Sequence, residues 1–508
     1  MIDLWLLGGI VAGLGAAGAA AAVWSAGRFA KLKRGPRSEA LPPGTGTALD
    51  DLLAPLEAAH PGLSAAAHVP GAQDALRLRL ACAQLASRSL DLLYYIWDDD
   101  LTGRLLARAV LEAADRGARV RMLLDDVNVL NRDPVYRALD RHPRIEVRLF
   151  NPIRNRDRGF RRGLEILLTL LPYNRRMHGK LWLADGRLGI TGGRNIGDAY
   201  FGALEGPRHN YLDLDTLLAG PVLRDAEALF DRFWNAGVAL PIRTLWPGRK
   251  TRLSRFRSRL ARYFRQPAIR ARLDALALQE AEEAAGALAL DRLHWTDRLR
   301  FLGDPPEKAL GARPDGWMPE ALLPVLRAAR KELRIATPYF VPGTEGLAEL
   351  IALQRKGVQV SIVTNGLALA DNVVVHGAYR WYRARLLREG VRLFEVAAQT
   401  GPRRMLHSKA FLVDGETGFV GSFNFDLRSA FLNTELGVVF DDPVLVQGLR
   451  AILDATTAPE AAFAVILDGK LSLWSRGGDG ATHLEPDSNL FKRTVSFVIG
   501  HLPIHRFL

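Results

Sequence analysis

The stretch that decides the fold is RRMHGKLWLADGRLGITGGRN at residues 175–195, which has a counterpart, RRMLHSKAFLVDGETGFVGSFN, at residues 403–424. Both copies contain His-x-Lys-x4-Asp and then, after six more residues, Gly-[Gly/Ser]-x-Asn, and no spacing differs between them. Six matched positions that occur twice indicate a duplicated chain. They are His178, Lys180, Asp185, Gly192, Gly193 and Asn195 in the first copy, and His407, Lys409, Asp414, Gly421, Ser422 and Asn424 in the second.

The segments around the two copies repeat as well. Helical and strand patterns alternate over residues 75–125, and the same order returns further along the chain, with strand patterns at residues 332–342 and 358–366. Gly117 and Gly357 lie 240 positions apart, as do Asp125 and Asn365. Alternating strands and helices favour a parallel or mixed sheet covered by helices. We therefore expect an α/β fold with two mixed β-sheets, flanked by helices and related by pseudo-twofold symmetry.

A chain of 508 residues exceeds what one core usually supports. The patterns divide it into a transmembrane anchor (1–28), a basic linker rich in Pro and Gly (29–47), a first half (48–245), a basic inserted segment (246–310) and a second half with its C-terminal tail (311–508). Cys82 is the only cysteine, which excludes a disulfide within the chain.

Residues 4–24 carry no charge and, as a helix rising about 1.5 Å per residue, would cover roughly one hydrocarbon core. Gly9 and Gly13 have the small-xxx-small spacing of helix dimers, which predicts a homodimer through this segment. A cleaved signal peptide is the alternative interpretation. The positive-inside rule places the chain that follows in the cytoplasm. The basic residues behind that expectation are Arg28, Lys31, Lys33, Arg34 and Arg37.

The net charge of +13 indicates an anionic partner: nucleic acid, anionic lipid or a phosphate ester. The basic residues 249–272 carry apolar side chains at helical spacing, so this helix either lies on an anionic membrane surface or exposes a solvated face. The apolar run LEILLTLL at residues 164–171 either dips into a bilayer or forms a buried helix.

The matched positions point to phosphodiester chemistry. In each copy His and Lys are two apart at the head of an apolar strand, so their side chains share one face. One neutral imidazole can attack phosphorus while a second, protonated one gives its proton to the leaving alcohol. The pair His178 and His407 would do this, and Lys180 and Lys409 would hold the phosphoryl oxygens in place of a metal ion. We expect no cofactor and no metal, because neither copy offers two neutral ligands at metal spacing.

Further residues support this predicted site. Asn195 and Asn424 can donate a side-chain N–H to a phosphoryl oxygen, and the glycines before them let the backbone approach a ligand closely. Gly193 and its counterpart Ser422 are therefore predicted to bind phosphate as well. Asp213 and Glu435 follow the two histidines at similar distances and would orient the imidazoles, with Asp215 as the alternative to Asp213. Asp185 and Asp414 complete the motif and are predicted among its catalytic residues. They fall in the turn after the strand, where a carboxylate can fix the turn or balance charge.

These motifs resemble the phospholipase D superfamily and, within it, bacterial cardiolipin synthases of the C type. The segments that carry the resemblance are YYIWDDD (94–100), GGRNIGDAYFGA (192–203), VVVHGAYRWYRARLLREGV (373–391), GSFNFDLRS (421–429), NTELG (433–437) and the C-terminal FKRTVSFVIGHLPIHRFL (491–508). One departure is Gly193, where many members of the superfamily have Ser or Thr.

The resemblance implies a bacterial inner-membrane phosphatidyltransferase that acts on phospholipids at an anionic membrane surface and does not bind nucleic acid. A phosphatidyl-histidine would form, and phosphatidylglycerol would attack it to give cardiolipin, with phosphatidylethanolamine or phosphatidylglycerol as donor. By analogy His178 is the nucleophile and His407 the general acid and then base, although the roles can be exchanged. The alternatives are a hydrolase that releases phosphatidic acid, a nuclease of the same superfamily and an inactive membrane adaptor.

Overall fold

The computed structural model describes residues 34–501, with gaps at 157–158, 206–208, 247–251, 277–283, 313–314, 399–403 and 477–478, and a few positions before residue 19. Most of the expected membrane segment, residues 4–24, therefore lies outside the described residues. Among those described, no helix combines the length and apolarity needed to cross a bilayer.

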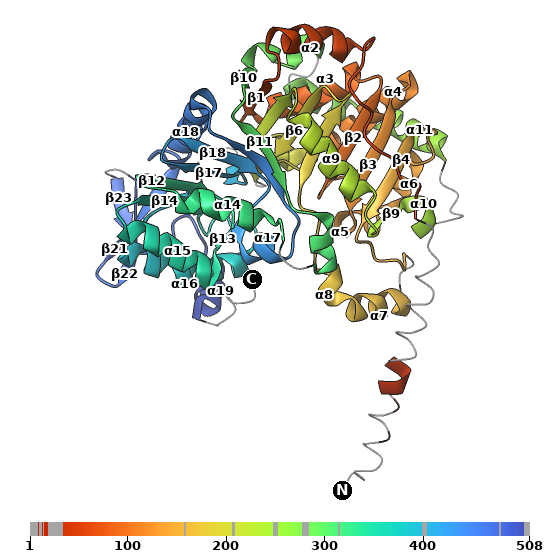
Figure 1. Cartoon of the computed structure of the whole chain (residues 1–508). Coiled ribbons are helices and arrows are strands. Elements are labelled where there is room, and N and C mark those ends of the chain that lie inside the picture. Colours follow the sequence, from red (N-terminus) through yellow and green to blue (C-terminus); the bar gives the residue numbers. More distant parts are fainter. Residues whose placement is uncertain are drawn as a thin grey trace.

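Two large mixed sheets form the body of the protein (Figure 1). The first has nine strands in the order β10 (His294–Thr296), β1 (Ser64–Val69), β8 (Asp215–Ala219), β6 (Leu188–Gly192), β5 (Lys180–Ala184), β2 (Ser89–Tyr94), β3 (Arg119–Asp125), β4 (Ile145–Phe150) and β9 (Ala239–Pro241). The second has ten, in the order β11 (Leu299–Gly303), β20 (Leu436–Phe440), β18 (Thr417–Gly421), β17 (Lys409–Val413), β12 (Glu332–Ala336), β14 (Gln359–Asn365), β15 (Arg392–Val396), β21 (Ala462–Asp468), β22 (Leu471–Arg476) and β23 (Asp479–Thr482).

The two sheets share one plan, which confirms the expected duplication. In each, three parallel strands (β2, β3 and β4, or β12, β14 and β15) adjoin three antiparallel ones (β5, β6 and β8, or β17, β18 and β20). Helix α4 (Leu101–Arg116) ends at Gly117, whose φ of 118° is the left-handed conformation of a helix C-cap.

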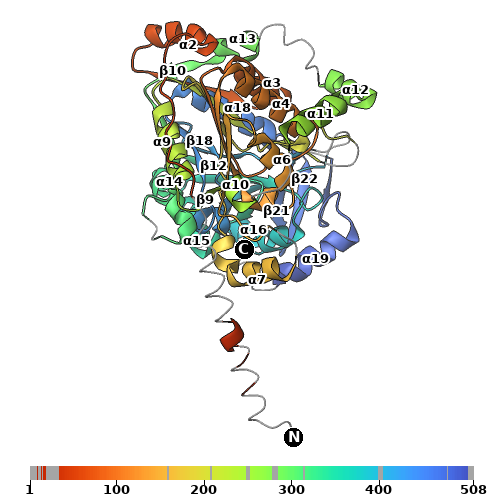
Figure 2. The same cartoon turned by 90° about the vertical axis from the view of Figure 1, so that its right-hand side faces the viewer.

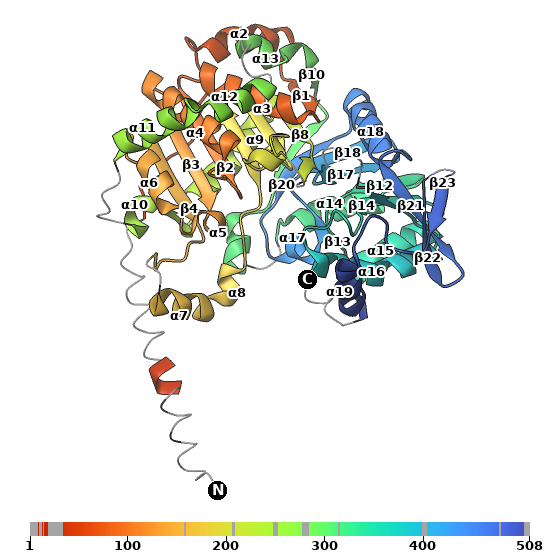
Figure 3. The same ribbon diagram turned by 180° about the vertical axis from the view of Figure 1, so that it is seen from behind.

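Helices flank the two sheets (Figures 1 and 3). The longer helices are α2 (Ala48–Ala59), α3 (Ala72–Leu85), α9 (Leu223–Trp234), α11 (Leu253–Phe264), α12 (Pro267–Ala275), α14 (Met318–Arg327), α15 (Gly343–Arg355), α16 (Val373–Arg388), α18 (Pro443–Thr457) and α19 (Leu490–His501). The shorter ones are α5 (Asp126–Val129), α6 (Asp133–Leu139), α7 (Phe160–Leu168), α8 (Leu170–Tyr173), α10 (Ile242–Leu245), α13 (Ala284–Ala287) and α17 (Leu427–Phe431).

One apolar core joins the two halves. It contains Leu183 and Leu218 from the first sheet, Val438 from the second, Phe230 of α9 and Leu449 of α18, all buried. An interface that resembles a domain core holds its two sides in one relative position. The residues at the heads of β5 and β17 are therefore held at a constant separation.

The basic segment 246–310 differs from its expected form. The apolar face of α11, with Phe256, Leu260 and Phe264, is buried in the core of the first half, so it is not available to a membrane. Helix α11 therefore has its apolar face in the core and its basic face in solvent, as the second of the two interpretations of residues 249–272 predicted. The end of the segment also supplies edge strands to both sheets, β10 to the first and β11 to the second, so it is not a separate linker.

Candidate active site

Backbone hydrogen bonds join the two halves at their interface. Strand β7 (Asn210–Leu212) of the first half pairs in parallel with β16 (Arg404–Leu406) of the second. The amide of His407 donates to the carbonyl of Leu212 at 2.7 Å, and the amide of His178 donates to the carbonyl of Thr434 at 2.9 Å. The residues that follow these carbonyls, Asp213 and Glu435, are thereby carried to the histidine of the opposite half.

Each imidazole is held by a carboxylate from the other half. Nδ1 of His178 lies 2.9 Å from Oε2 of Glu435, and Nδ1 of His407 lies 2.6 Å from Oδ2 of Asp213. The sequence interpretation grouped Asp213 with the first copy and Glu435 with the second, whereas the structure crosses the pairs. The alternative assignment, in which Asp215 orients an imidazole, is wrong, because the carboxylate of Asp215 forms an ion pair with Arg79 at 2.9 Å.

Gly193 and Ser422, which were predicted to bind phosphate, lie against the carboxylates of Asp213 and Glu435 instead. The hydroxyl of Ser422 donates to Oε2 of Glu435 at 2.5 Å. A Cβ on Gly193 would lie 2.0 Å from Oδ1 of Asp213, so only glycine leaves room for that carboxylate. A second donor to Glu435, the hydroxyl of Ser429 at 2.8 Å, was missed by the sequence analysis, although it lies in the GSFNFDLRS segment.

Both lysines are buried beside the histidines. The ammonium of each donates to the backbone carbonyl of the histidine two positions earlier, and Nζ of Lys409 also lies 3.1 Å from Nε2 of His407. Burial and the charge of Lys409 lower the pKa of Lys180 to about 7. Burial likewise lowers the pKa of Lys409 to about 8. Two cationic groups without bulk water form a site suited to an anion.

The imidazoles are neutral at neutral pH. Burial lowers the pKa of His178 to about 4, against the attraction of Glu435, and lowers that of His407 to about 3, with Lys409 adding to the effect. Burial opposes ionisation of Asp213 and Glu435, but their histidine partners keep both pKa values below the ordinary range. Because Nδ1 donates to a carboxylate, Nε2 of each ring carries the lone pair.

The two asparagines are placed differently. Asn195 accepts from the amide of Ile96 at 3.1 Å and donates to the hydroxyl of Tyr200 at 2.9 Å, so its side chain is already engaged. Oδ1 of Asn424 is buried and has no hydrogen-bond partner among the residues that the structure describes. The donor Nδ2 of Asn195 is already used by Tyr200, so Asn195 is the less available of the two to donate to a phosphoryl oxygen.

Asp185 and Asp414 do not belong with the catalytic groups. Each follows the last residue of its strand, β5 or β17, at the opposite end from the lysine. Asp185 accepts from the amides of residues 87, 88 and 89 at 2.7–3.1 Å, and Asp414 from those of residues 330, 331 and 332 at 2.7–3.1 Å. The prediction that both are catalytic is thus corrected: they join β5 or β17 to the start of the neighbouring antiparallel strand, β2 or β12.

In each half, one polar side chain fixes the backbone of the residue just before the histidine. Asp125, at the end of β3, accepts from the amide of Met177 at 2.9 Å. Asn365, at the end of β14, accepts from the amide of Leu406 at 2.8 Å. These are the residues that the sequence placed 240 positions apart, and each fixes the residue just before a histidine.

Tyrosines surround the imidazoles. The ring of Tyr95 packs edge-on against His178 with centroids 5.0 Å apart, and Tyr200 and Tyr211 pack against His407 at 5.3 and 4.9 Å. The sequence analysis did not single them out, although YYIWDDD and GGRNIGDAYFGA contain two of them. Their rings help to exclude water from the two histidines.

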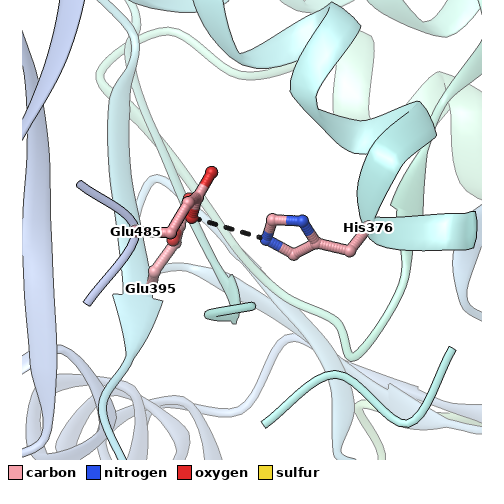
Figure 4. Close-up of side chains that lie close together, drawn as sticks. All are labelled: His376, Glu395 and Glu485. Atoms are coloured by element: carbon pink, nitrogen blue, oxygen red, sulfur yellow. Dashed lines mark ion pairs between the residues drawn. The ribbon is translucent and has the colours of Figure 1, made fainter. Parts of the chain in front are cut away.

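A separate cluster in the described part of the chain brings together His376, Glu395 and Glu485, with ligand atoms within 4.8 Å of one another (Figure 4). The guanidinium of Arg383 donates to Glu395 at 3.0 Å and to Glu485 at 2.9 Å. This internal cation balances the carboxylates, so the cluster is an ion-pair network that ties the segment before α19 to α16.

Three comparisons place this architecture among known proteins. The family model described as "Cardiolipin synthase, PLD-like domain" matches residues 80–234 and 322–456. Cardiolipin synthase C of Escherichia coli (strain K12) is 36% identical over 485 residues, covering 91% of this chain and 99% of the relative. Cardiolipin synthase A of Yersinia pseudotuberculosis serotype O:3 is 27% identical, covering 79% and 71%.

Among solved structures, phosphatidylserine synthase of Haemophilus influenzae Rd KW20 shares the fold, with a TM-score of 0.52 at 13% identity over 81% of this chain and 91% of that one. The paired motifs, the two mixed sheets and the family match agree. The chain therefore belongs to the cardiolipin synthase family of the phospholipase D superfamily and is a phosphatidyltransferase homologous to cardiolipin synthase C.

Proposed function

We propose that the protein makes cardiolipin by transferring a phosphatidyl group from phosphatidylethanolamine or phosphatidylglycerol to phosphatidylglycerol. The observation that carries the proposal is the pair of neutral imidazoles, each held by a carboxylate of the opposite half, with two buried lysines beside them. The similarity to cardiolipin synthase C supports lipids as the substrate class.

In the first step Nε2 of His178 attacks phosphorus, and the bond from phosphorus to the head-group oxygen breaks. His407, protonated when the phosphodiester anion raises its pKa, gives its proton to the leaving alcohol. In the second step His407 takes a proton from the glycerol hydroxyl of phosphatidylglycerol, whose oxygen attacks phosphorus and releases His178. Lys180 and Lys409 stabilise the charge on the phosphoryl oxygens throughout.

The surroundings of the two rings favour His178 as the nucleophile. No described residue hydrogen-bonds to its Nε2, whereas Nζ of Lys409 lies 2.9 Å from Nδ1 and 3.1 Å from Nε2 of His407. An ammonium beside both nitrogens of the His407 ring makes that ring the poorer nucleophile. Mass spectrometry of His407→Ala protein quenched with substrate is expected to find a phosphatidyl adduct on His178. An adduct on His407 in the His178→Ala protein, with none in the reciprocal variant, would exchange the roles.

The reaction itself is tested by incubating the purified full chain with both phospholipids and separating the products. Cardiolipin is expected. Phosphatidic acid without cardiolipin would indicate a hydrolase and refute the proposal, as would cleavage of DNA without action on lipid. A cellular phenotype unchanged by His178→Ala and His407→Ala would point to the adaptor role instead.

We also propose that residues 1–28 anchor the protein in the inner membrane as a single pass, with the catalytic body in the cytoplasm, and that Gly9 and Gly13 support a homodimer. A pseudo-twofold axis would relate the halves, residues 48–245 and 311–508. The uncharged run and the basic residues after it support the topology. Reporter fusions after Arg37 test it, and a periplasmic signal would contradict it.

A further inference from the structure

Helix α7 turns its apolar face to the solvent. Phe160, Leu167 and Leu168 are 83%, 70% and 44% exposed, at the spacing that puts side chains on one face of a helix. The opposite face is held by a polar residue: Glu165 is buried, and its carboxylate accepts from the amides of Arg154 and Asn155 at 2.8 Å each. This is the reverse of the usual arrangement in a water-soluble domain. A fully buried helix therefore does not account for the part of the run whose side chains the structure describes, residues 164–169.

Helix α19 has the same reversed arrangement. Its exposed apolar residues form one stripe: Leu490, Phe491, Phe497 and Val498 are 78%, 75%, 53% and 51% exposed. The other face is fastened to α16, where the hydroxyl of Ser496 lies 3.1 Å from Nδ1 of His376. The ion-pair network of Figure 4 fixes the segment just before the helix.

Helices α7 and α19 lie at the same end of the molecule in all three views (Figures 1, 2 and 3), and α8 lies beside α7 in Figures 1 and 3. This end is linked to the active site. Arg428 of α17 donates to the side chain of Asn174 at 2.8 Å and to its carbonyl at 3.0 Å, four residues before His178. Phe431, also on α17, is 50% exposed.

We propose that these side chains form an apolar rim that inserts into the lipid bilayer and brings the active site to its substrates. The rim comprises Phe160, Leu167, Leu168, Phe431, Leu490, Phe491, Phe497 and Val498. The inference rests on the proposed function, because phospholipid substrates are what make a bilayer the occupant.

Two further observations favour a bilayer over a second copy of the chain. Arg161, exposed beside Phe160, suits anionic head groups. The guanidinium of Arg34 lies against Gly237, and burial together with the positive charge of Arg34 lowers the pKa of Arg154, in the loop that leads into α7. The 33 residues before Arg34 include the uncharged run at 4–24, so a membrane-bound run would join the body beside the rim.

The test places a fluorescent thiol label on the full chain at Leu167→Cys or Phe491→Cys, with Val444→Cys as the matched control. Val444 is 54% exposed at the start of α18, away from the rim in Figure 1. The native Cys82 is buried and competes little for the reagent. The protein is reconstituted into vesicles of phosphatidylethanolamine and phosphatidylglycerol, some with brominated acyl chains.

Brominated chains are expected to quench both rim labels several-fold more than the Val444→Cys label, and aqueous iodide is expected to do the reverse. Equal iodide quenching at all three positions would overturn the proposal. So would energy transfer between rim labels on different molecules without bromine quenching, which would identify a protein partner. Because quenching needs no turnover, a protein that binds this way but makes no cardiolipin would refute the proposed function and leave the rim standing.

Discussion

Glu435 and Asp213 each hold one imidazole, but their surroundings differ. Glu435 receives hydrogen bonds from the hydroxyls of Ser422 and Ser429 as well as from His178. Asp213 receives one from the amide of Leu214 at 2.9 Å and lies against Gly193. The longer acid is steadied by hydroxyl groups, and the shorter acid needs a glycine beside it. The departure at Gly193 from the superfamily pattern therefore follows from which acid the first copy faces.

Loss of either carboxylate is the largest expected effect, and it tests the crossed pairing. Glu435→Gln and Asp213→Asn should each lower kcat/KM by on the order of 10²–10⁴-fold, because an amide does not hold the correct tautomer or stabilise the imidazolium. NMR of histidine-labelled protein should show Glu435→Gln perturbing His178 and Asp213→Asn perturbing His407. The opposite pattern would contradict the crossing.

Exchanging the neighbours of the acids should produce a smaller, unequal effect. Gly193→Ser puts a Cβ where Oδ1 of Asp213 lies, and we expect a fall in kcat/KM of roughly 10²-fold, as a displaced acid misorients its imidazole. Ser422→Gly removes one hydrogen bond to a charged acceptor, which is worth roughly 1.5–3 kcal/mol and so at least about tenfold. Thermal melting of both variants controls for misfolding. A larger fall in kcat/KM for Ser422→Gly than for Gly193→Ser would contradict the explanation that Asp213 depends more on its neighbour than Glu435 does.

The lysines should set the alkaline limit of activity. A lysine whose pKa is lowered loses its charge as pH rises through that value, so kcat/KM should fall above about pH 7, where Lys180 titrates, and further above about pH 8, where Lys409 does. In the protein without substrate the histidines, with pKa values near 4 and 3, stay neutral through the same range. Lys180→Arg keeps its charge and should move the first limb upward in a pH profile. A profile flat from pH 6 to 9 would exclude this role.

The two motif aspartates should affect stability more than chemistry. Asp185→Ala removes a buried carboxylate that accepts from three amides, and we expect the free energy of unfolding to fall by roughly 2–4 kcal/mol. Asp414 makes the same contacts near the surface, so Asp414→Ala should cost less. Denaturant unfolding measures both. If kcat per folded molecule fell as far as in the histidine variants, the two aspartates would have to be counted as catalytic residues.

Much of the site was predictable because its signals are local. The spacing of His178 and Lys180 on one strand, their repetition at His407 and Lys409, and the cap at Gly117 depend on neighbours within a few residues. The partner of each acid was not predictable, because the pairing of β7 with β16 joins segments 194 residues apart. The turn position of Asp185 was predictable, but its three amide partners were not, since they lie at residues 87–89.

By itself the sequence determined a duplicated α/β chain with two histidines and two lysines set for phosphodiester chemistry, since periodicity and spacing act over short distances. Only the tertiary structure decided which acid holds which imidazole, and which amphipathic helix faces inward. Helices α11 and α7 both carry an apolar stripe, yet α11 buries it in the core and α7 exposes it. A stripe predicts that a helix has an apolar face, but what covers that face depends on long-range packing.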